Sequence, residues 1–437
     1  MIYGGDGLSR LPPDASGRGK AVFLPFVLAG ERVEATLTEQ KSGFARAKVN
    51  SVVEASPHRV EPGCPYFSRC GGCQYQHASY EHQLEIKKEI LRETLKRTAK
   101  LDLDSEIQVH PSPPWNYRNR SRLQVQTAPN FAIGYFRMGS HELLPVETCP
   151  ISSPLINRAI TAFWQSGRAG KVPKGIREIE CFANADDTQL LVEVSSDATS
   201  RRSALRTWVE ELRASMPEIV GAVVIRDTDQ GGSHAQEKML TSGADHLIYK
   251  TAKADYRVSA GSFFQTNRHM IDELVNVVTG GQSGELAVDF YSGVGLFSTA
   301  LAGDIRHIVS VESSQTSSGD LAYNLPSNGK AVRATTEQYL ARSENSGRIE
   351  PGAVLPQSVD KPDLAVVDPP RNGLGERVAR MLSTLGAPRV AYVSCDPATL
   401  ARDLVILTGS GYRIEHVHMV DLFPQTFHLE TVVHLVR

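Results

Sequence analysis

Residues 393–403 read VSCDPATLARD, and they complete an apolar run, 390–393, that is typical of a short buried parallel strand. Asp396 and Pro397 then predict the start of a helix, with aspartate as the N-cap and proline at the first helical position. Cys395 therefore falls on a tight strand-to-helix turn at the positive end of a helix dipole, which favours its thiolate form. A cysteine taken alone is more often a small buried hydrophobic residue, so its role depends on the neighbouring motifs.

The C-terminal part, residues 255–437, alternates apolar strands with helical segments. This alternation predicts an α/β fold, a doubly wound Rossmann-like sheet covered by helices on both faces. The last two strands are too close in sequence for a crossover helix, so we expect them to form an antiparallel hairpin. The predicted strands are 287–290, 308–311, 331–333, 364–367, 390–393, 414–420 and 431–436.

A nucleoside-binding turn is predicted where residues 289–298 read DFYSGVGLFS, because a strand, a Gly-x-Gly turn and a helix follow one another. Glu312 ends the next strand about 20 residues on, where a carboxylate can bind both ribose hydroxyls. The third glycine of the dinucleotide motif is absent, since Ser298 stands after Phe297. A pyrophosphate needs that close backbone approach, whereas S-adenosylmethionine does not. The motif therefore favours a methyltransferase over a dehydrogenase.

Two carboxylates complete a candidate reaction centre. Asp368 begins the sequence DPPR at the end of the fourth strand, and the two prolines would hold it rigidly at the ligand-binding edge. Arg371 stands where base-aminomethylating enzymes have an aromatic residue, which argues against an exocyclic amine as the target. A Cys395 thiolate that adds to C6 of a pyrimidine makes C5 nucleophilic toward a sulfonium methyl group. Glu430 precedes the last strand and could remove the C5 proton, although a surface glutamate is an equal interpretation.

Residues 1–56 contain short strand-like runs between glycine-rich breaks, which predicts a small β-barrel of about five strands. Residues 57–254 are expected to form an α+β central domain, with an exposed loop at 227–242. Four of the six cysteines form a candidate metal site, three of them clustered and one remote. Their spacing fits Zn²⁺ and a [4Fe–4S] cluster equally, and Cys181 is expected in the core. The four candidate ligands are Cys64, Cys70, Cys73 and Cys149.

The 437 residues are 41% hydrophobic and 22% charged, which is typical of a globular protein. They contain no apolar run near the ~20 residues of a membrane span and no signal peptide, so we expect a cytoplasmic protein without a membrane or an obligate protein partner. The net charge of −2 does not favour polyanion binding by the whole molecule. Local charge favours the binding of a polyanion, because Arg118, Arg120 and Arg122 are clustered and the helix predicted over 80–99 is rich in basic residues.

Taken together, these motifs resemble the RNA (uracil-5-)-methyltransferase family over nearly the whole chain. The resemblance implies an S-adenosylmethionine-dependent enzyme with an N-terminal TRAM barrel that binds RNA, and a [4Fe–4S] cluster rather than zinc on the four cysteines. It assigns the nucleophile to Cys395 and the base to Glu430. It assigns the cofactor contacts to Gln265, Tyr291, Glu312 and Asp368.

The resemblance also implies a substrate. The tRNA-specific branch lacks both barrel and cluster, so structured RNA of the 23S rRNA type is expected. A tRNA T-loop uridine is the alternative within the same chemistry, and a non-catalytic iron–sulfur RNA-binding protein is the alternative outside it. The chain departs from the family pattern at Ser292, Leu296, Thr335 and Asp396, which usually or often are cysteine, asparagine, aspartate and asparagine.

Overall fold

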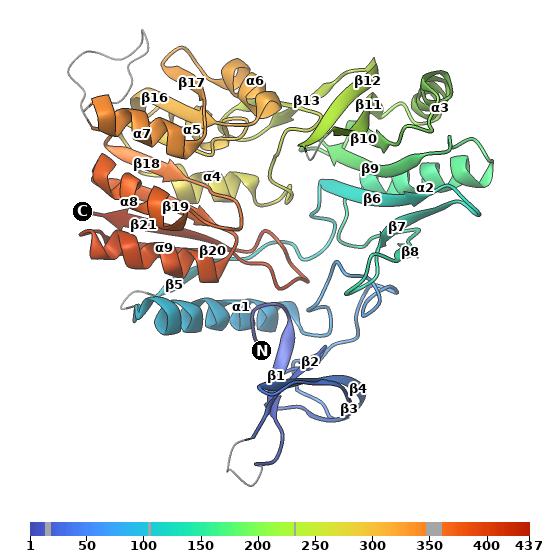
Figure 1. The fold of residues 1–437 in the computed structure, drawn as a ribbon, viewed down its shortest axis with the longest axis horizontal. Coiled ribbons are helices and arrows are strands. Elements are labelled where there is room, and N and C mark those ends of the chain that lie inside the picture. The colour runs from blue at the N-terminus through green and yellow to red at the C-terminus, as the bar shows by residue number, and fades with distance from the viewer. Residues whose placement is uncertain (14–18, 104–105, 231–232, 347–360) are drawn as a thin grey trace.

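The computed structural model describes residues 1–13, 19–103, 106–230, 233–346 and 361–437. Three parts follow one another along the chain, with the N-terminal strands below, the middle sheet to the right and the C-terminal sheet to the left in Figure 1. Within the described residues, each helix is too short or too polar to cross a lipid bilayer.

The N-terminal part is a four-stranded sheet in the order β1-β2-β4-β3, which is one strand fewer in the described residues than the barrel we expected. Strand β3 alternates polar and apolar residues because only one of its faces packs on the small core, which Val22, Leu24 and Ala45 build. The strands are β1 (Asp6–Arg10), β2 (Ala21–Pro25), β3 (Arg32–Gln40) and β4 (Phe44–Glu54).

The middle part is a seven-stranded sheet in the order β12-β11-β10-β9-β6-β7-β8. One face packs on helices α2 (Pro154–Arg168) and α3 (Arg202–Ser215), and Cys181 lies fully buried in this core, as predicted. The prediction of an exposed loop at 227–242 is wrong, because these residues fall mostly in two antiparallel strands. The strands are β6 (Arg120–Gln126), β7 (Ala132–Phe136), β8 (Leu143–Pro145), β9 (Ile176–Ala183), β10 (Leu190–Ser196), β11 (Ile219–Gln230) and β12 (Ser233–Gly243).

The C-terminal sheet has eight strands in the order β17-β16-β15-β18-β19-β21-β20-β5. The predicted doubly wound sheet is confirmed, and β21 runs antiparallel to both of its neighbours. Strands β15 and β18 lie side by side although two strands separate them in sequence, and such a switch point opens a crevice at the carboxyl ends of the strands. The strands are β15 (Gly284–Phe290), β16 (Ile305–Glu312), β17 (Gly329–Arg333), β18 (Leu364–Val367), β19 (Arg389–Ser394), β20 (Arg413–Val420) and β21 (Glu430–Val436).

Helices cover this sheet on both faces, as near-continuous apolar strands require (Figure 1). The helices are α4 (Ile271–Thr279), α5 (Leu296–Leu301), α6 (Gln315–Asn324), α7 (Thr336–Ser346), α8 (Gly375–Leu385) and α9 (Pro397–Gly409).

Two elements from earlier in the chain also pack on the C-terminal sheet. Strand β5 (Ile107–His110) pairs in parallel with β20 at the edge of the sheet. Helix α1 (Tyr80–Thr94) packs near α9, and a π-helical turn, Leu95–Ala99, extends it. A hairpin of β13 (His246–Lys250) and β14 (Asp255–Ser259) leads from the middle sheet into the C-terminal part.

Candidate functional site

The turn after β15 borders a narrow crevice at the edge of the sheet. Tyr291 has a φ of +59°, and Gly295 has a φ of +92° as the N-cap of α5. The glycine is needed there because a side chain at that left-handed φ would be strained. The turn brings backbone N–H groups to the carboxyl edge of the sheet, where a nucleoside ligand binds in this class of fold.

Three of the four predicted cofactor contacts line one narrow cavity at this turn, namely Gln265, Tyr291 and Asp368. Glu312 lies directly behind it, because its carboxylate accepts hydrogen bonds from the N–H groups of Gly293 (2.9 Å) and Ser314 (2.6 Å). These bonds fix the carboxylate at the end of β16, where it can receive further hydroxyl donors. The structure therefore brings the four residues together at one edge of the sheet.

The departures from the family pattern all have structural roles here. Ser292 and Leu296 line the same cavity. Thr335 begins α7 with a capping box, since its hydroxyl accepts from the Gln338 N–H and the Gln338 side chain accepts from the Thr335 N–H. Asp396 caps α9 through two bonds, from the N–H groups of Ala398 (3.0 Å) and Thr399 (2.9 Å).

Cys395 lies between the end of β19 and the start of α9, as the sequence predicted, and its side chain is partly exposed. Burial and the negative charges of Glu430 and Asp368 raise the pKa of the thiol to about 12, and the guanidinium of Arg371 opposes them. The expected preference for thiolate is therefore wrong for the ligand-free protein. A helix N-terminus favours the anion, but two carboxylates and partial desolvation outweigh it at this position.

Glu430 is the first residue of β21 and lies on the strand next to that of the cysteine, since Thr431 pairs with Ser394. Its side chain is buried, and burial together with the charge of Asp368 raises its pKa well above the ordinary value. Burial and the neighbouring Asp289 raise the pKa of Asp368 to about 7. A nucleophile and two carboxylates thus meet beside the cofactor crevice.

Arg371 borders this centre together with two side chains that the sequence did not single out, His428 and Tyr3. Nη2 of Arg371 lies 3.4 Å from Nδ1 of His428, and burial and that guanidinium lower the pKa of the imidazole to about 4. The hydroxyl of Tyr3 donates to the carbonyl oxygen of Cys395 at 3.2 Å. No sequence signal connects Tyr3 with this turn, because 392 positions separate the two residues.

Comparison with known proteins identifies this arrangement. The family described as tRNA (Uracil-5-)-methyltransferase matches residues 79–437. The chain belongs to this family. Relatives include an RNA methyltransferase of Aquifex aeolicus, 33% identical over 439 residues that cover 99% of this chain and 96% of the relative. Another, from Streptomyces coelicolor, is 32% identical over 458 residues, with 99% and 90% covered.

The fold of this (uracil-5-)-methyltransferase also has a solved counterpart. The tRNA (uracil-54, C5)-methyltransferase of Pyrococcus abyssi, in complex with S-adenosyl-L-homocysteine, aligns with a TM-score of 0.73 at 24% identity. The alignment covers 99% of this chain and 100% of that one. The chain is thus an RNA methyltransferase of this family with the class I methyltransferase fold.

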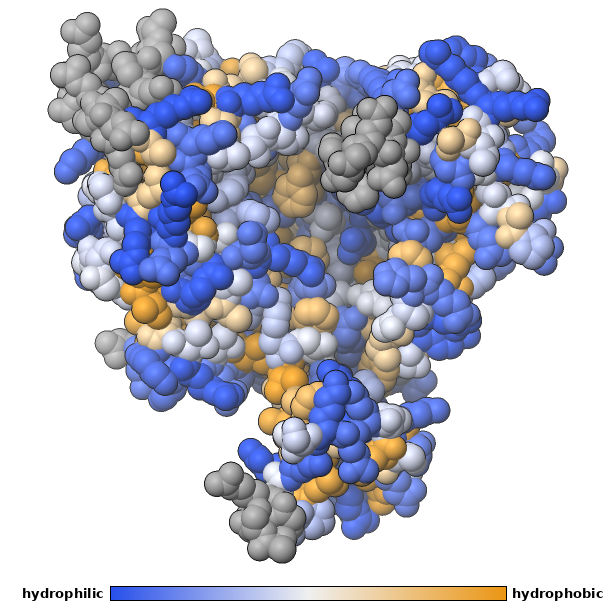
Figure 2. Space-filling view, viewed as in Figure 1, coloured by the Kyte–Doolittle hydropathy of each residue, from blue (hydrophilic) through white to orange (hydrophobic). Residues whose placement is uncertain are grey.

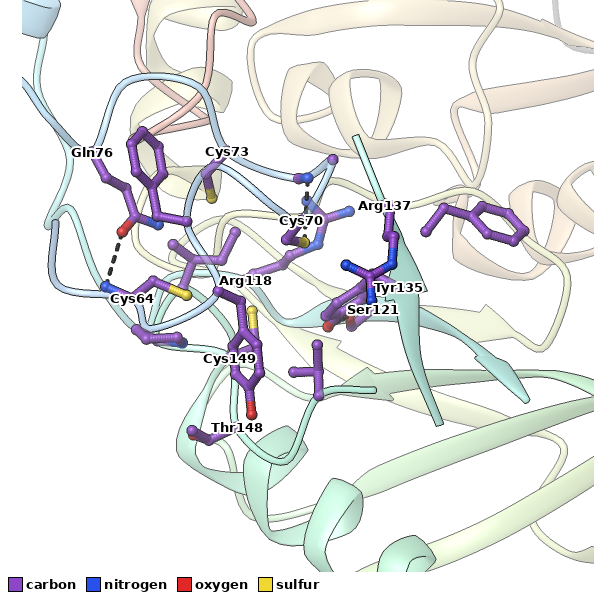
Figure 3. Close-up of a pocket in the computed structure, with 18 of the residues that line it drawn as sticks. Cys64, Cys70, Cys73, Gln76, Arg118, Ser121, Tyr135, Arg137, Thr148 and Cys149 are labelled. Carbon is purple, nitrogen blue, oxygen red and sulfur yellow. Dashed lines mark hydrogen bonds between the residues drawn. The ribbon is translucent and has the colours of Figure 1, made fainter. Parts of the chain in front are cut away.

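The four candidate cysteine ligands of the methyltransferase surround one cavity of about 400 Å³. Figure 3 shows the sulfur atoms of Cys64, Cys70, Cys73 and Cys149 around this space, on the 64–73 loop and on the segment before α2. A side-chain acceptor helps to fix the loop, because the Cys64 N–H donates to Oε1 of Gln76 at 3.0 Å. The cysteines that the sequence grouped are therefore grouped in space.

The arrangement of the four thiols does not by itself show a metal site. Among the residues that the structure describes, no group of three or more His, Cys, Asp or Glu side chains is placed to hold a metal ion. Burial raises the pKa of Cys70 to about 11, and the nearby Cys149 and Cys64 thiols act in the same direction. Such thiols become thiolates only when a positively charged centre binds between them.

The predicted RNA contacts of the arginine cluster are only partly available. Arg120 is buried, donates to the Ser262 carbonyl oxygen (2.6 Å) and pairs with Glu180 (2.8 Å). Arg122 also pairs with Glu180, at 2.8 Å. The prediction that Arg118, Arg120 and Arg122 all hold RNA is therefore wrong for Arg120, whose donors are used within the protein, whereas Arg118 lines the cysteine cavity.

The basic face of α1 is similarly neutralised. Lys88 pairs with Glu106, and Arg92 pairs with Glu89, at 2.9 and 3.0 Å. The face in Figure 2 is largely hydrophilic and is hollowed between the C-terminal and middle parts.

Proposed function

We propose that this methyltransferase transfers a methyl group from S-adenosylmethionine to C5 of one uridine in 23S rRNA through a covalent bond between Cys395 and C6. The observation that carries the proposal is the meeting of Cys395, Glu430 and Asp368 beside the crevice that Tyr291 and Gln265 line.

The residues of the chain have separate roles in this reaction. Cys395, whose side chain is partly exposed, loses its thiol proton to solvent, and the thiolate adds to C6 of an extruded uracil, which places electron density on C5. S-adenosylmethionine supplies the electrophilic methyl group when it is bound. Glu430 then takes the proton from C5, and elimination of the Cys395 sulfur restores the ring. The raised pKa of Glu430 makes its carboxylate a stronger base than an exposed glutamate.

The same geometry supports the assignment of cofactor contacts. Glu312 would accept from the ribose hydroxyls, Tyr291 would pack on the nucleoside, and Gln265 and Asp368 would bind the polar amino acid end. Burial leaves Asp368 with a proton affinity that a cationic ligand would lower.

We also propose that Cys64, Cys70, Cys73 and Cys149 hold a [4Fe–4S] cluster. The grouping of the four cysteines around one cavity supports it. Iron and sulfide analysis of anaerobically purified protein, with its visible absorption band, separates a cluster from zinc and from reduced thiols.

The three-domain division at 1–56, 57–254 and 255–437 remains a proposal, with RNA binding assigned to the first part. An RNA substrate and free cysteines favour a cytoplasmic location.

A tRNA T-loop uridine is the second candidate substrate. The solved tRNA (uracil-54, C5)-methyltransferase aligns over 99% of this chain, so the overall architecture is compatible with a tRNA substrate as well as an rRNA substrate.

Transfer of labelled methyl groups to 23S rRNA and to tRNA transcripts, followed by mapping of the modified uridine, tests the proposal. We expect label at C5 of one uridine in 23S rRNA and none with Cys395→Ala. Label in tRNA alone favours the second candidate, and wild-type rates with Cys395→Ala contradict the covalent mechanism.

A further inference from the structure

We infer that Tyr3 is a positioning residue of the turn between β19 and α9, and that it couples the N-terminal sheet to the position of the Cys395 backbone. The inference rests on the proposed function, because it concerns the same nucleophile. Its starting point is the hydrogen bond from the Tyr3 hydroxyl to the carbonyl oxygen of Cys395, 3.2 Å long.

The N-terminal turn is built to carry this tyrosine into the C-terminal part. The Ile2 N–H donates to the Asp6 carbonyl oxygen at 3.0 Å, which closes residues 2–6 into a compact turn just before β1. Gly4 and Gly5 have φ values of +107° and +95°, where other residues would be strained. A Cβ at position 5 would lie 2.8 Å from Cβ of Gln74, so the turn also touches the segment next to Cys73.

The ring of Tyr3 is held as firmly as its hydroxyl. It meets the ring of Phe427 edge to face, with centroids 5.3 Å apart, and it packs against the core of the C-terminal sheet. Phe427 belongs to the segment 421–429, which leads directly into Glu430. Tyr3 therefore touches both the turn that carries the nucleophile and the segment that leads to the base.

The hydroxyl keeps its proton at neutral pH and can therefore donate. Burial raises the pKa of Tyr3, and the nearby Asp396, Cys395 and Glu430 raise it further. A neutral phenol can donate to a carbonyl oxygen without adding charge beside a thiolate. The turn around Cys395 also has a local anchor, since the Asp396 N–H donates to Oγ of Ser394 at 3.3 Å. Tyr3 is thus an anchor that comes from the N-terminal part and reaches the backbone of Cys395.

The position of the turn explains what the coupling could do. Figure 1 shows the N-terminus between the N-terminal strands and α1, beside the C-terminal part. RNA that binds the N-terminal sheet would restrain the 1–6 segment and, through Tyr3, the carbonyl of Cys395. The nucleophile would then be most precisely held when RNA is bound by both parts.

The test uses full-length protein and 23S rRNA and tRNA transcripts that contain 5-fluorouridine. S-adenosylmethionine is added as the methyl donor. After methyl transfer the fluorine at C5 cannot be removed as a proton, so the methylated adduct of Cys395 with C6 persists and its rate of formation can be followed on a denaturing gel. We expect Tyr3→Phe to trap about five- to tenfold more slowly than wild type, while KM for RNA changes by less than about twofold. Gly5→Ala should slow trapping as well, because it displaces the same turn.

Tyr412→Phe is the matched control, since the Tyr412 hydroxyl also donates to a backbone carbonyl oxygen, that of Ala387, at 2.7 Å. We expect it to lower Tm but to trap at the wild-type rate. Wild-type trapping rates in both Tyr3→Phe and Gly5→Ala, or equal slowing in Tyr412→Phe, would overturn the inference. Failure of the wild-type enzyme to trap either RNA, or trapping by Cys395→Ala, would instead overturn the proposed function.

Discussion

Acidic groups crowd the edge of the sheet where the reaction is proposed to occur. Asp289, Asp368 and Glu430 all have raised pKa values, and Cys395 is the fourth group that must lose a proton there. Each negative charge makes the next ionisation harder, because the groups lie in a partly buried site. A cationic ligand in the crevice would lower all of these pKa values together, so the centre is suited to act only after such a ligand is bound.

Glu430→Gln isolates the step that removes the C5 proton. Glutamine has the same shape but cannot accept that proton, so we expect turnover to fall about 10²- to 10⁴-fold. The adduct between Cys395 and the methylated uridine should accumulate on ordinary RNA, detected as a labelled protein–RNA band on a denaturing gel. Cys395→Ala should give no such band, and turnover of Glu430→Gln near the wild-type rate would rule out this residue as the base.

We expect Asp368→Asn to raise the stability of the protein and to lower its methyl-transfer activity. The raised pKa of Asp368, about 7, means that the folded protein binds this proton more tightly than the unfolded chain does. That stabilisation is complete below the ordinary aspartate pKa and is lost as pH rises from about 4 to about 7. Asparagine mimics the protonated form at every pH. We expect the variant to be more stable than wild type by about 1–2 kcal/mol at pH 8 and by less at pH 5, as measured by denaturant unfolding.

Methyl transfer by Asp368→Asn should fall at the same time, because the carboxylate that would bind the cationic ligand is lost. Isothermal calorimetry with S-adenosylmethionine supplies the separate readout. Equal stability of the two proteins at pH 8, with unchanged ligand affinity, would contradict the assigned environment of Asp368.

Among the elements, α9 connects helix stability directly to the nucleophile. Its N-cap, Asp396, follows Cys395 and accepts two backbone hydrogen bonds. We expect Asp396→Ala to lower the free energy of unfolding by about 1 kcal/mol and to slow adduct formation, because the freed turn no longer fixes the cysteine. Asp396→Asn retains an acceptor and should behave as wild type in both assays. Identical losses in the two variants would show that charge, not capping, is what matters.

The elements that sequence reasoning placed correctly are those whose signal is local. The apolar runs at 287–290 and 390–393 lie in β15 and β19, and Asp396-Pro397 does start α9. The misplaced segment 227–242 is polar and lacks the alternation of a half-buried strand, although its backbone pairs as β11 and β12. Strand pairing is a tertiary property that such a segment does not encode in its own pattern.

Long-range pairings are invisible to sequence patterns for the same reason. Residues 107–110 pair with β20, about 300 positions later, and no local pattern marks this partner. The grouping of Cys64 with Cys149 could be proposed because thiols have few other uses together. The contact of Tyr3 with Cys395 could not, because an N-terminal tyrosine has many packing roles. Site chemistry was therefore easier to predict than site support.

Across the whole molecule, the 421–429 segment joins parts that are distant in sequence. Lys87 forms a buried ion pair with Asp421, with Nζ 2.6 Å from Oδ1. Gln83 and Gln425 exchange two hydrogen bonds, from the Gln83 side-chain amide to Oε1 of Gln425 and from the Gln425 N–H to Oε1 of Gln83. Helix α1 therefore holds the segment that ends at the proposed base. Removing one partner of a buried ion pair is strongly destabilising, which makes this contact a firm anchor.

The cysteine loop holds the same segment from the other side. The N–H groups of Gln74 and Tyr75, which directly follow Cys73, donate to the Gln425 carbonyl oxygen at 3.0 and 2.9 Å. A group that is bound by Cys73 would thus restrain the backbone that leads to Glu430. The cysteine cavity and the reaction centre are coupled through two hydrogen bonds, although their side chains line different cavities.

Cys73→Ser tests this coupling at the scale of the whole molecule. We expect the variant to lose bound iron and to show faster amide hydrogen exchange in residues 421–429, measured by mass spectrometry, because the ordered loop no longer fixes Gln425. Cys181→Ala is the control, since it changes a buried cysteine of the middle sheet and leaves the cavity intact. If iron is lost while exchange in 421–429 stays at the wild-type rate, the loop does not support the base. Faster exchange in 421–429 with a smaller change elsewhere would show that the cysteines help to align Glu430. The reason is that Gln425 is bonded to the cysteine loop and to α1.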